Sequence, residues 1–167
     1  TELKNNGKED LGVEYVSSFA LLGIDKEGLL STDQKLEVLI ARNAWQKELI
    51  WNRFSMDQLG MSISQPDKVR RSSQTISVGN TGNWSTKNYL PMGCLKNKET
   101  DSILFWQIEQ NGSWYWEISD QDGHMYLQLS GPTEHQSHWW KNLKPGDTFK
   151  SVPVSIGSAC GDVEEAA

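Results

Sequence analysis

A segment rich in aromatic, amide and carboxylate side chains is the part of the sequence best suited to bind a ligand. It runs from Phe105 to Ser119, reads FWQIEQNGSWYWEIS and holds three of the chain's eight tryptophans. Asn111 and Gly112 lie at its centre, and both residue types tolerate the positive φ angles of a two-residue type I′ turn. We therefore predict an antiparallel hairpin in which Gln110 faces Ser113.

The register of this hairpin decides which side chains share a face. Counting outward from the turn pairs Glu109 with Trp114 and Gln107 with Trp116, because strand side chains alternate with period two. Trp106 then falls on the opposite face. Sugars commonly stack their apolar C–H faces on aromatic rings while their hydroxyls bond to amides and carboxylates. The pattern predicts a carbohydrate-binding face, and the alternative is that the tryptophans are core residues of a sandwich.

Catalytic chemistry has less support in the sequence. Glycoside hydrolysis generally uses two carboxylates that flank one bond, and Glu109 and Glu117 are the pair in this segment. The predicted hairpin places them on opposite faces, so they cannot flank one substrate. No serine lies in a GxSxG motif, and Gly157–Gly161 is as readily a plain connector. We expect no catalytic residue in this chain.

The group Glu134–His138 holds one carboxylate and two imidazoles. Two histidines three residues apart can share a metal ion on a helix face. Here the flanking residues indicate a loop that enters a strand, since Gly131-Pro132 comes before the group and Trp139-Trp140 after it. The HExxH order of zinc proteases is absent. We expect neither a metal site nor a cofactor, with hydrogen bonding in the loop or contact with a ligand as the alternatives.

Length, charge and cysteine content limit the class of protein. The 167 residues suit one domain, and 22 acidic against 16 basic residues give a formal charge of −6. This charge opposes binding to nucleic acid, and the basic cluster Lys68, Arg70 and Arg71 is more readily a solvated loop. No apolar run approaches the roughly 20 residues of a membrane span. The first residues, TELKNNGKED, are too polar for a signal peptide. Cys94 and Cys160 indicate neither a disulfide scaffold nor zinc, so a cytoplasmic and a secreted location both stay open.

Short strand-like runs alternate with turn residues along the rest of the chain. Almost no helical periodicity occurs, although Lys35–Leu59 would also suit a helix, and Pro153 indicates an edge strand or a bulge. We predict an all-β fold, an antiparallel β-sandwich with at most short helical turns, one of them near Ser55–Leu59. Besides the hairpin, the predicted strands are Val13–Leu22, Lys35–Ala41, Gln46–Phe54, Ser73–Val78, Met125–Leu129 and Thr148–Ile156.

Trp139 and Trp140 are adjacent, so on an extended chain their rings point in opposite directions and cannot both enter one core. We expect one ring at a surface or an interface, and the alternative is that both lie between two packed layers. The pair is our candidate for an interface through which the chain self-associates.

The last residues, GDVEEAA, have the pattern of a helix start. Asp162 can serve as N-cap, Glu165 lies three positions later as in a capping box, and two alanines follow. A single turn is not stable alone, because nucleation is costly. We therefore divide the chain into a β-sandwich domain at 1–161 and a helix start at 162–167, which we expect to lead into a further part of a longer protein.

Five segments, in fixed order along the chain, carry a family resemblance. They are EYVSSFAL (14–21), RSSQTISVGNTGNWSTKNYLPMG (71–93), FWQIEQNGSWYWEIS (105–119), LSGPTEHQSHWWKNLKPGDTF (129–149) and GDVEEAA (161–167). Together they resemble the amino-terminal domain of α-galactosidases of glycoside hydrolase family 36. The resemblance runs over nearly the whole chain, and the order of the segments contributes as much to it as their content.

The resemblance implies a β-supersandwich packed against a catalytic (β/α)8 barrel, with a smaller carboxy-terminal β-domain. In the family, an aspartate nucleophile and an aspartate acid/base on the barrel hydrolyse terminal α-galactosides with retention of configuration. Those residues map onto no position here, so we expect the chain to be inactive by itself. The family's domain also implies strands that precede this segment. The barrel is the expected partner, with a homo-oligomer and a galactoside ligand as further candidates.

Two functions therefore remain open. The chain is either the non-catalytic amino-terminal domain of an α-galactosidase or an independent carbohydrate-binding module that uses its tryptophan face. A glycan screen separates them, because a module should bind a soluble galactoside unaided.

Overall fold

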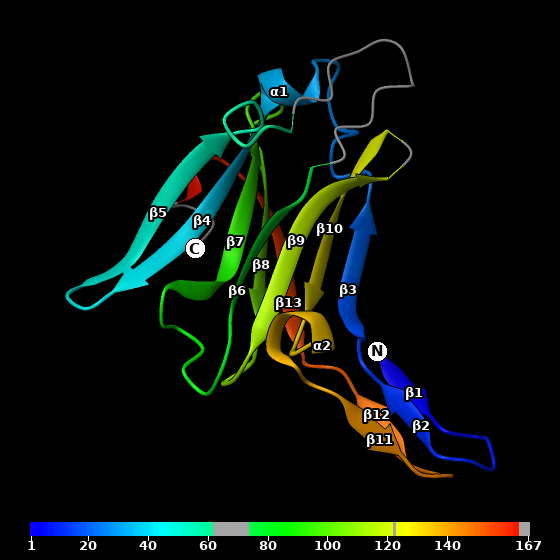
Figure 1. The fold of residues 1–167 in the computed structure, drawn as a ribbon. Helices are drawn as coiled ribbons and strands as arrows, with labels where there is room; N and C mark the ends of the chain where they lie inside the picture. The colour runs from blue at the N-terminus through cyan, green and yellow to red at the C-terminus, as the bar shows by residue number, and fades with distance from the viewer. Residues whose placement is uncertain (62–73, 122, 164–167) are drawn as a thin grey trace.

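The protein folds as two packed antiparallel sheets with a pair of short ribbons at one end (Figure 1). The computed structural model describes residues 1–61, 74–121 and 123–163. The predicted all-β sandwich is confirmed. In these ranges no helix is long and apolar enough to cross a membrane.

The larger sheet has five strands. They are β4 (Leu36–Ala44), β5 (Lys47–Ser55), β7 (Tyr89–Asn97), β8 (Ser102–Ile108) and β13 (Val154–Cys160). Their order is β13-β8-β7-β4-β5, and each neighbouring pair is antiparallel. The strands predicted at Lys35–Ala41 and Gln46–Phe54 are confirmed, and they form a hairpin rather than the alternative helix.

The smaller sheet has four strands. They are β3 (Ser17–Leu22), β6 (Ile76–Asn80), β9 (Trp114–Gln121) and β10 (His124–Ser130). Their order is β3-β10-β9-β6, again with antiparallel neighbours. The β9–β10 hairpin turns at Gly123, whose φ of 79° suits a residue without a side chain.

The two ribbons explain why two predicted strands are each divided. The ribbons pair β1 (Glu2–Lys4) with β12 (Thr148–Lys150), and β2 (Leu11–Val13) with β11 (Lys141–Leu143). Val13–Leu22 is therefore split between a ribbon and β3, and Thr148–Ile156 between a ribbon and β13. Pro153 lies at the second break, where it cannot donate a ladder hydrogen bond, and β13 is an edge strand as predicted.

Helical structure in the described residues consists of short turns. α1 (Thr32–Lys35) begins at Ser31, which forms a capping box with Gln34. α2 (Glu134–Ser137) begins at Thr133, whose side chain accepts the N–H of Gln136. Glu134–His138 therefore starts with one helical turn instead of the predicted loop, because the Thr133 cap satisfies a free N–H of the first turn.

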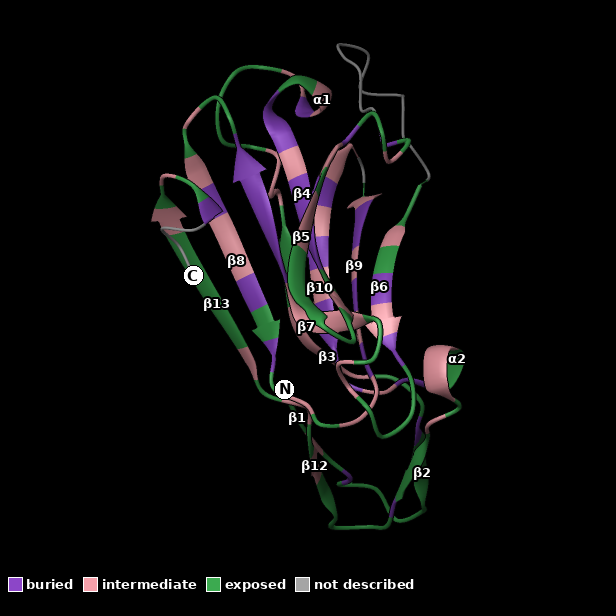
Figure 2. Ribbon diagram, turned by 90° about the vertical axis from the view of Figure 1, so that its left-hand side faces the viewer, coloured by how far each residue is buried: buried purple, intermediate pink, exposed green. Residues whose placement is uncertain are grey.

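Buried residues recur at alternate positions along β9 and β10 (Figure 2), and the buried side chains of both sheets form one core cluster. Leu36, Val38 and Ile40 alternate inward along β4, as the sequence pattern predicts. Burial of such side chains stabilises the fold by about 1.5–3 kcal/mol each. A smaller apolar cluster lies apart from this core and consists of Leu39, Cys94, Ile103 and Val163, with Trp51 and Phe105 packed against it.

The predicted hairpin between Phe105 and Ser119 is wrong. β8 pairs with β7 and β13, whereas β9 pairs with β6 and β10, so the two strands lie in different sheets. Asn111 and Gly112 are both described, and neither has a positive φ. The Asn-Gly pair is therefore part of a connection that carries the chain from one sheet to the other.

Some sequence-based predictions fall outside the described residues. These are the basic cluster Lys68, Arg70 and Arg71, the start of the strand predicted at Ser73–Val78, and the helix predicted at 162–167 beyond Val163. Within the described part, Val163 is buried and the Asp162 carboxylate pairs with Arg53 at 3.1 Å.

Candidate functional site

The tryptophans predicted to form an exposed sugar-binding face lie in the core. Trp114 is 2% exposed and Trp116 is 0% exposed. The inward face of β9 carries both rings, and the five-stranded sheet covers it. The prediction of an exposed tryptophan face is therefore wrong, and the alternative, that the rings are sandwich core, is correct.

The two polar residues predicted to accompany these rings lie on the other sheet. Gln107 belongs to β8 and pairs with Met92 on one side and Ser155 on the other. The exposed Glu109 carboxylate accepts a hydrogen bond from the Ser155 hydroxyl at 2.6 Å. The structure therefore does not bring Gln107 and Glu109 beside Trp114 and Trp116, because the predicted strand pair does not form.

The outward face of β9 carries a different aromatic and acidic group. The Glu117 carboxylate accepts hydrogen bonds from two phenols, those of Tyr115 and Tyr126, the second at 2.8 Å. Tyr115 and Glu117 are two residues apart on β9, and Gln128 on β10 lies directly opposite Glu117. The Gln128 amide in turn donates to the phenol of Tyr15. Period-two alternation and strand pairing thus collect these groups on one side of the sheet.

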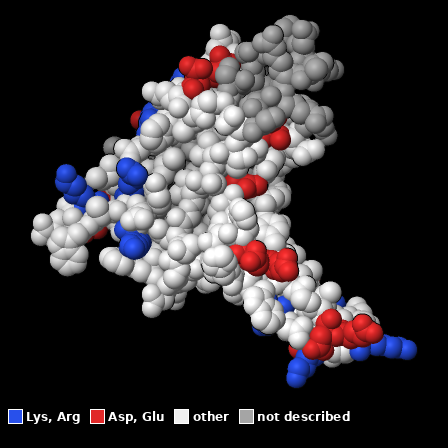
Figure 3. Space-filling view, in the orientation of Figure 1, with Lys and Arg blue, Asp and Glu red and all other residues white. Residues whose placement is uncertain are grey.

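A pocket of about 270 Å³ opens beside this group. The side of the pocket opposite β9 consists of α2 and of the segment before β3. A hydrogen bond joins these two segments, because the Glu134 N–H donates to the Glu14 carbonyl at 2.9 Å. In Figure 3, acidic side chains are visible over this part of the surface. We call this site the tyrosine pocket, and its lining residues are Glu14, Tyr15, Tyr115, Glu117, Gln128, Thr133, Glu134, His135 and Gln136.

The phenols of the tyrosine pocket remain protonated donors over a wide pH range. Burial, and then the negative charge of Glu117, raise the pKa of Tyr15 to about 12. Burial and the hydrogen bond to Glu117 also raise the pKa of Tyr115 and of Tyr126, because ionisation would place two negative charges side by side.

Several solved structures of much longer α-galactosidase chains contain the same architecture. The chain superposes on the GH36 α-galactosidase AgaA of Geobacillus stearothermophilus with a TM-score of 0.70 and 15% identity, over 96% of this chain and 19% of that one. An α-galactosidase of Lactobacillus brevis gives a TM-score of 0.69 at 15% identity, with the same coverage. The galactosidase domain of the α-galactosidase-sucrose kinase AgaSK gives 0.70 at 21% identity, over 95% of this chain and 19% of that one.

The chain has the fold of one part of the GH36 α-galactosidases. No protein-family model and no curated protein sequence matches it. The chain spans about a fifth of the length of these enzymes. The fold that the five sequence segments imply is thus confirmed at low identity, since the order of strands and turns persists where most side chains differ.

The tyrosine pocket carries side chains whose chemistry suits a neutral polyol. It combines aromatic rings, phenol donors, a carboxylate and an amide, which together suit the C–H faces and hydroxyls of a sugar. Sequence reasoning missed this site because it took the wrong face of β9 as the exposed one. The alternation along β9 could have indicated this site. If Trp114 and Trp116 face the core, Tyr115 and Glu117 must lie on the opposite, outward face.

The histidines near α2 show no arrangement for a metal ion. The His138 backbone is left-handed, with φ of 53°, and its Nδ1 lies 3.9 Å from the Glu134 carboxylate. Within the described ranges, no group of three or more His, Cys, Asp or Glu side chains could hold a metal.

Trp139 and Trp140 have different surroundings. The Trp139 ring packs on Phe149, with centroids 5.5 Å apart, whereas Trp140 is 66% exposed. One of the two rings is thus exposed, as the sequence predicts, and the role of Trp140 in an interface stays a prediction.

Proposed function

We propose that this chain is the non-catalytic amino-terminal β-sandwich domain of an α-galactosidase-like glycoside hydrolase that acts on terminal α-galactosides. One observation carries the proposal: the fold matches GH36 α-galactosidases over 95–96% of this chain but over only 19% of theirs. A catalytic domain of the same longer protein is then the natural partner of this sandwich, and a second copy of the protein is a further candidate.

The surroundings of the two acids discussed above support a non-catalytic role. Cleavage of a glycosidic bond generally needs two carboxylates on either side of it. Glu117 is held by two tyrosines on the outer face of the four-stranded sheet, while Glu109 follows β8 of the other sheet and contacts Ser155. These contacts suit structural hydrogen bonding better than paired acid and nucleophile chemistry.

An activity comparison tests the proposal. The 167-residue chain and the complete product of its native reading frame are each incubated with a nitrophenyl α-galactoside. We expect nitrophenol release from the complete protein only. Release by the 167-residue chain that persists in a Glu109→Ala, Glu117→Ala double variant would point to a contaminating enzyme. Release that this variant loses would overturn the proposal, as would a complete protein inactive on α-galactosides.

Binding of a neutral galactoside in the tyrosine pocket is a second candidate function. The observation that favours it is the Glu117 carboxylate held between Tyr115 and Tyr126 beside an open pocket. Titration calorimetry with raffinose should detect binding to the chain alone. Glu117→Gln, which keeps the size but removes the charge, should weaken this binding, and the exposed Glu9→Gln should not. Equal raffinose affinity of the wild type, Glu117→Gln and Glu9→Gln would show that the tyrosine pocket is not the binding site.

A further inference from the structure

A second pocket lies where the β4–β5 hairpin extends past the facing sheet. Ile40 of β4 belongs to the core, and its cross-strand partner on β5 is Asn52. Two pairs further along, Arg42 lies opposite Ile50. On β4 this face therefore changes from an apolar to a charged side chain toward the tip of the hairpin. A pocket of about 430 Å³ opens there.

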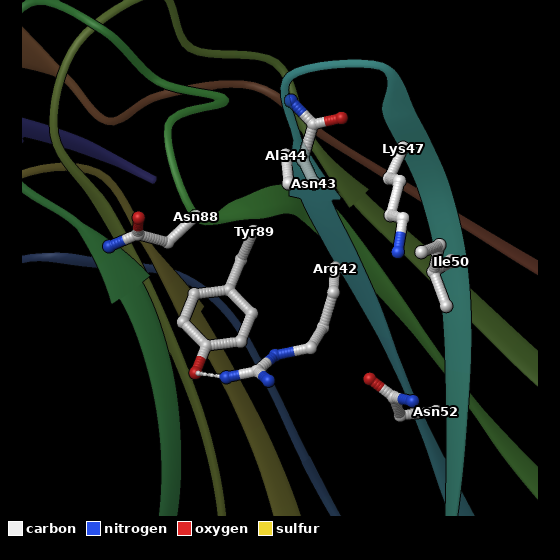
Figure 4. Close-up of a pocket in the computed structure, with 8 residues that line it drawn as sticks. All are labelled: Arg42, Asn43, Ala44, Lys47, Ile50, Asn52, Asn88 and Tyr89. Atoms are coloured by element: carbon white, nitrogen blue, oxygen red, sulfur yellow. Dashed lines mark hydrogen bonds between the residues drawn. The ribbon is translucent and has the colours of Figure 1, made fainter.

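Residues of the hairpin, of the β6–β7 connection and of the start of β7 line this pocket (Figure 4). We call it the arginine pocket. Its lining residues are Arg42, Asn43, Ala44, Lys47, Ile50, Asn52, Asn88 and Tyr89. Its volume falls within the range of about 300–1,000 Å³ that is usual for small-molecule sites.

The walls of the arginine pocket are tied together by hydrogen bonds. The Asn43 N–H donates to the Asn88 carbonyl at 3.0 Å, and the Asn43 side-chain amide donates to the Thr86 carbonyl at 2.6 Å. At the end of β6, the Asn80 side-chain amide donates to the carbonyls of Ser85 and Tyr89, each at 2.8 Å. The connection is thus held against β4, so little ordering is required when a ligand binds.

The Arg42 guanidinium is held in place by one aromatic side chain. It lies over the Tyr89 ring, 5.3 Å from its centroid, and donates to the Tyr89 hydroxyl at 3.2 Å. Figure 4 shows this contact and the Lys47 side chain on the facing strand. One hydrogen bond uses only part of the guanidinium fork, and the remaining N–H groups can meet an acidic group.

The side chains that line this pocket carry a net positive charge. Neither Arg42 nor Lys47 forms an ion pair within the described residues, and no acid lines the pocket. By contrast, Arg53 of the same hairpin pairs with both Glu37 and Asp162. Lysine and arginine side chains are prominent over this hairpin in Figure 3. Two unpaired cations in one pocket stand out in a chain of net charge −6.

We propose that the arginine pocket binds an acidic sugar, a hydroxylated ring that carries a carboxylate or a phosphate. Arg42 and Lys47 contact the acidic group, since a guanidinium fork matches the geometry of both anions. The amide of Asn52 on the facing strand offers an acceptor and donors to the ring hydroxyls. Tyr89 is a positioning residue that orients Arg42. This site is distinct from the tyrosine pocket and does not depend on the function proposed above.

Titration calorimetry of the 167-residue chain at low ionic strength tests the proposal with four probes: glucuronate, glucose 6-phosphate, glucose and inorganic phosphate. We expect at least one of the two acidic sugars to bind more tightly than both glucose and inorganic phosphate. A preference between the two acidic sugars identifies the acidic group as carboxylate or phosphate. If glucose binds as tightly as the acidic sugars, the proposed role of the cations is wrong. If inorganic phosphate binds as tightly as they do, the proposed recognition of the sugar ring is wrong.

Variants locate the site. Arg42→Gln and Lys47→Gln should each weaken binding of the acidic sugar by about tenfold or more. Lys8→Gln, which removes the same charge from an exposed position on a distant loop, should leave it unchanged. If Arg42→Gln fails to fold, Asn52→Asp places a carboxylate in the pocket at nearly constant volume and should abolish binding. Unchanged binding in the folded pocket variants, or equal weakening in Lys8→Gln, would overturn the proposal.

Discussion

Trp106 and Trp116 meet edge to face between the two sheets, with ring centroids 5.2 Å apart and ring planes at 78°. One ring comes from β8 and the other from β9, so this contact joins the two layers. Aromatic pairs of this kind add about 0.5–1.5 kcal/mol beyond the burial of their surface. The connection through Asn111 and Gly112 makes the contact possible, because it moves the chain from one sheet to the other.

Gly93→Ala should destabilise the fold through this tryptophan pair. Gly93 lies directly opposite Trp106 in the β7–β8 ladder, and a Cβ there would lie 2.5 Å from Cζ2 of the indole. We expect urea denaturation to show a loss of about 1–3 kcal/mol in the free energy of unfolding. Gly157→Ala on β13 is the control, because its Cβ would meet no atom within 4 Å. Equal stability of both variants would show that the Trp106 ring does not rest on the Gly93 backbone.

Two turn glycines should respond differently to alanine. Gly112 lacks a positive φ, and a Cβ added there would have no atom closer than 3.6 Å, so Gly112→Ala should change stability little. Gly123 has a φ of 79°, and Gly123→Ala should cost about 1 kcal/mol through backbone strain. Thermal melts of the two variants measure the contrast. A reversed order would favour the hairpin that the Asn-Gly pair alone suggests.

High pH should destabilise the protein through the tyrosine pocket. Burial and Glu117 raise the pKa of Tyr15 to about 12 in the folded state, and an unfolded tyrosine titrates near about pH 10. Between these values the unfolded chain has lost a proton that the native state keeps, so unfolding is favoured as pH rises. The stabilisation is complete below about pH 10 and is lost as pH approaches about 12.

Urea midpoints at a series of alkaline pH values measure this effect. Tyr15→Phe should make the decline with pH shallower, since it removes one titrating phenol. Phenolate absorbance of native protein, compared with that of the chain in urea, provides the direct control. Coincident native and denatured titration curves would contradict the raised pKa.

Trp140 should mediate self-association. Its ring is 66% exposed beside a partly buried Trp139, and exposed apolar surface of this kind marks contact sites when it is contiguous. We expect sedimentation at high protein concentration to show association that Trp140→Ser abolishes. Trp84→Ser, which removes another exposed ring on a different loop, should have no effect. A monomeric wild-type protein, or association that survives in Trp140→Ser, would remove Trp140 from the interface.

Local sequence patterns correctly predicted the class of fold and most of its strands. Alternation in Leu36, Val38 and Ile40 marks an inward strand face, because successive side chains of a pleated strand point to opposite sides. Pro153 indicated an edge strand or a bulge for an equally local reason, the missing N–H group, and β13 is an edge strand. The motif order also carried the resemblance to GH36 α-galactosidases, and the shared fold confirms it.

The sequence alone places Trp114 and Trp116 on one face of a strand and Tyr115 and Glu117 on the other. It could not decide which face is buried, because that depends on which sheet covers β9. Strand partners are likewise chosen by packing between residues far apart in the chain, so β8 and β9 separated despite the Asn-Gly pair. Both pockets likewise depend on contacts between residues far apart in the chain. Tyr15 reaches Gln128, and Arg42 reaches Tyr89, only after the sheets have assembled.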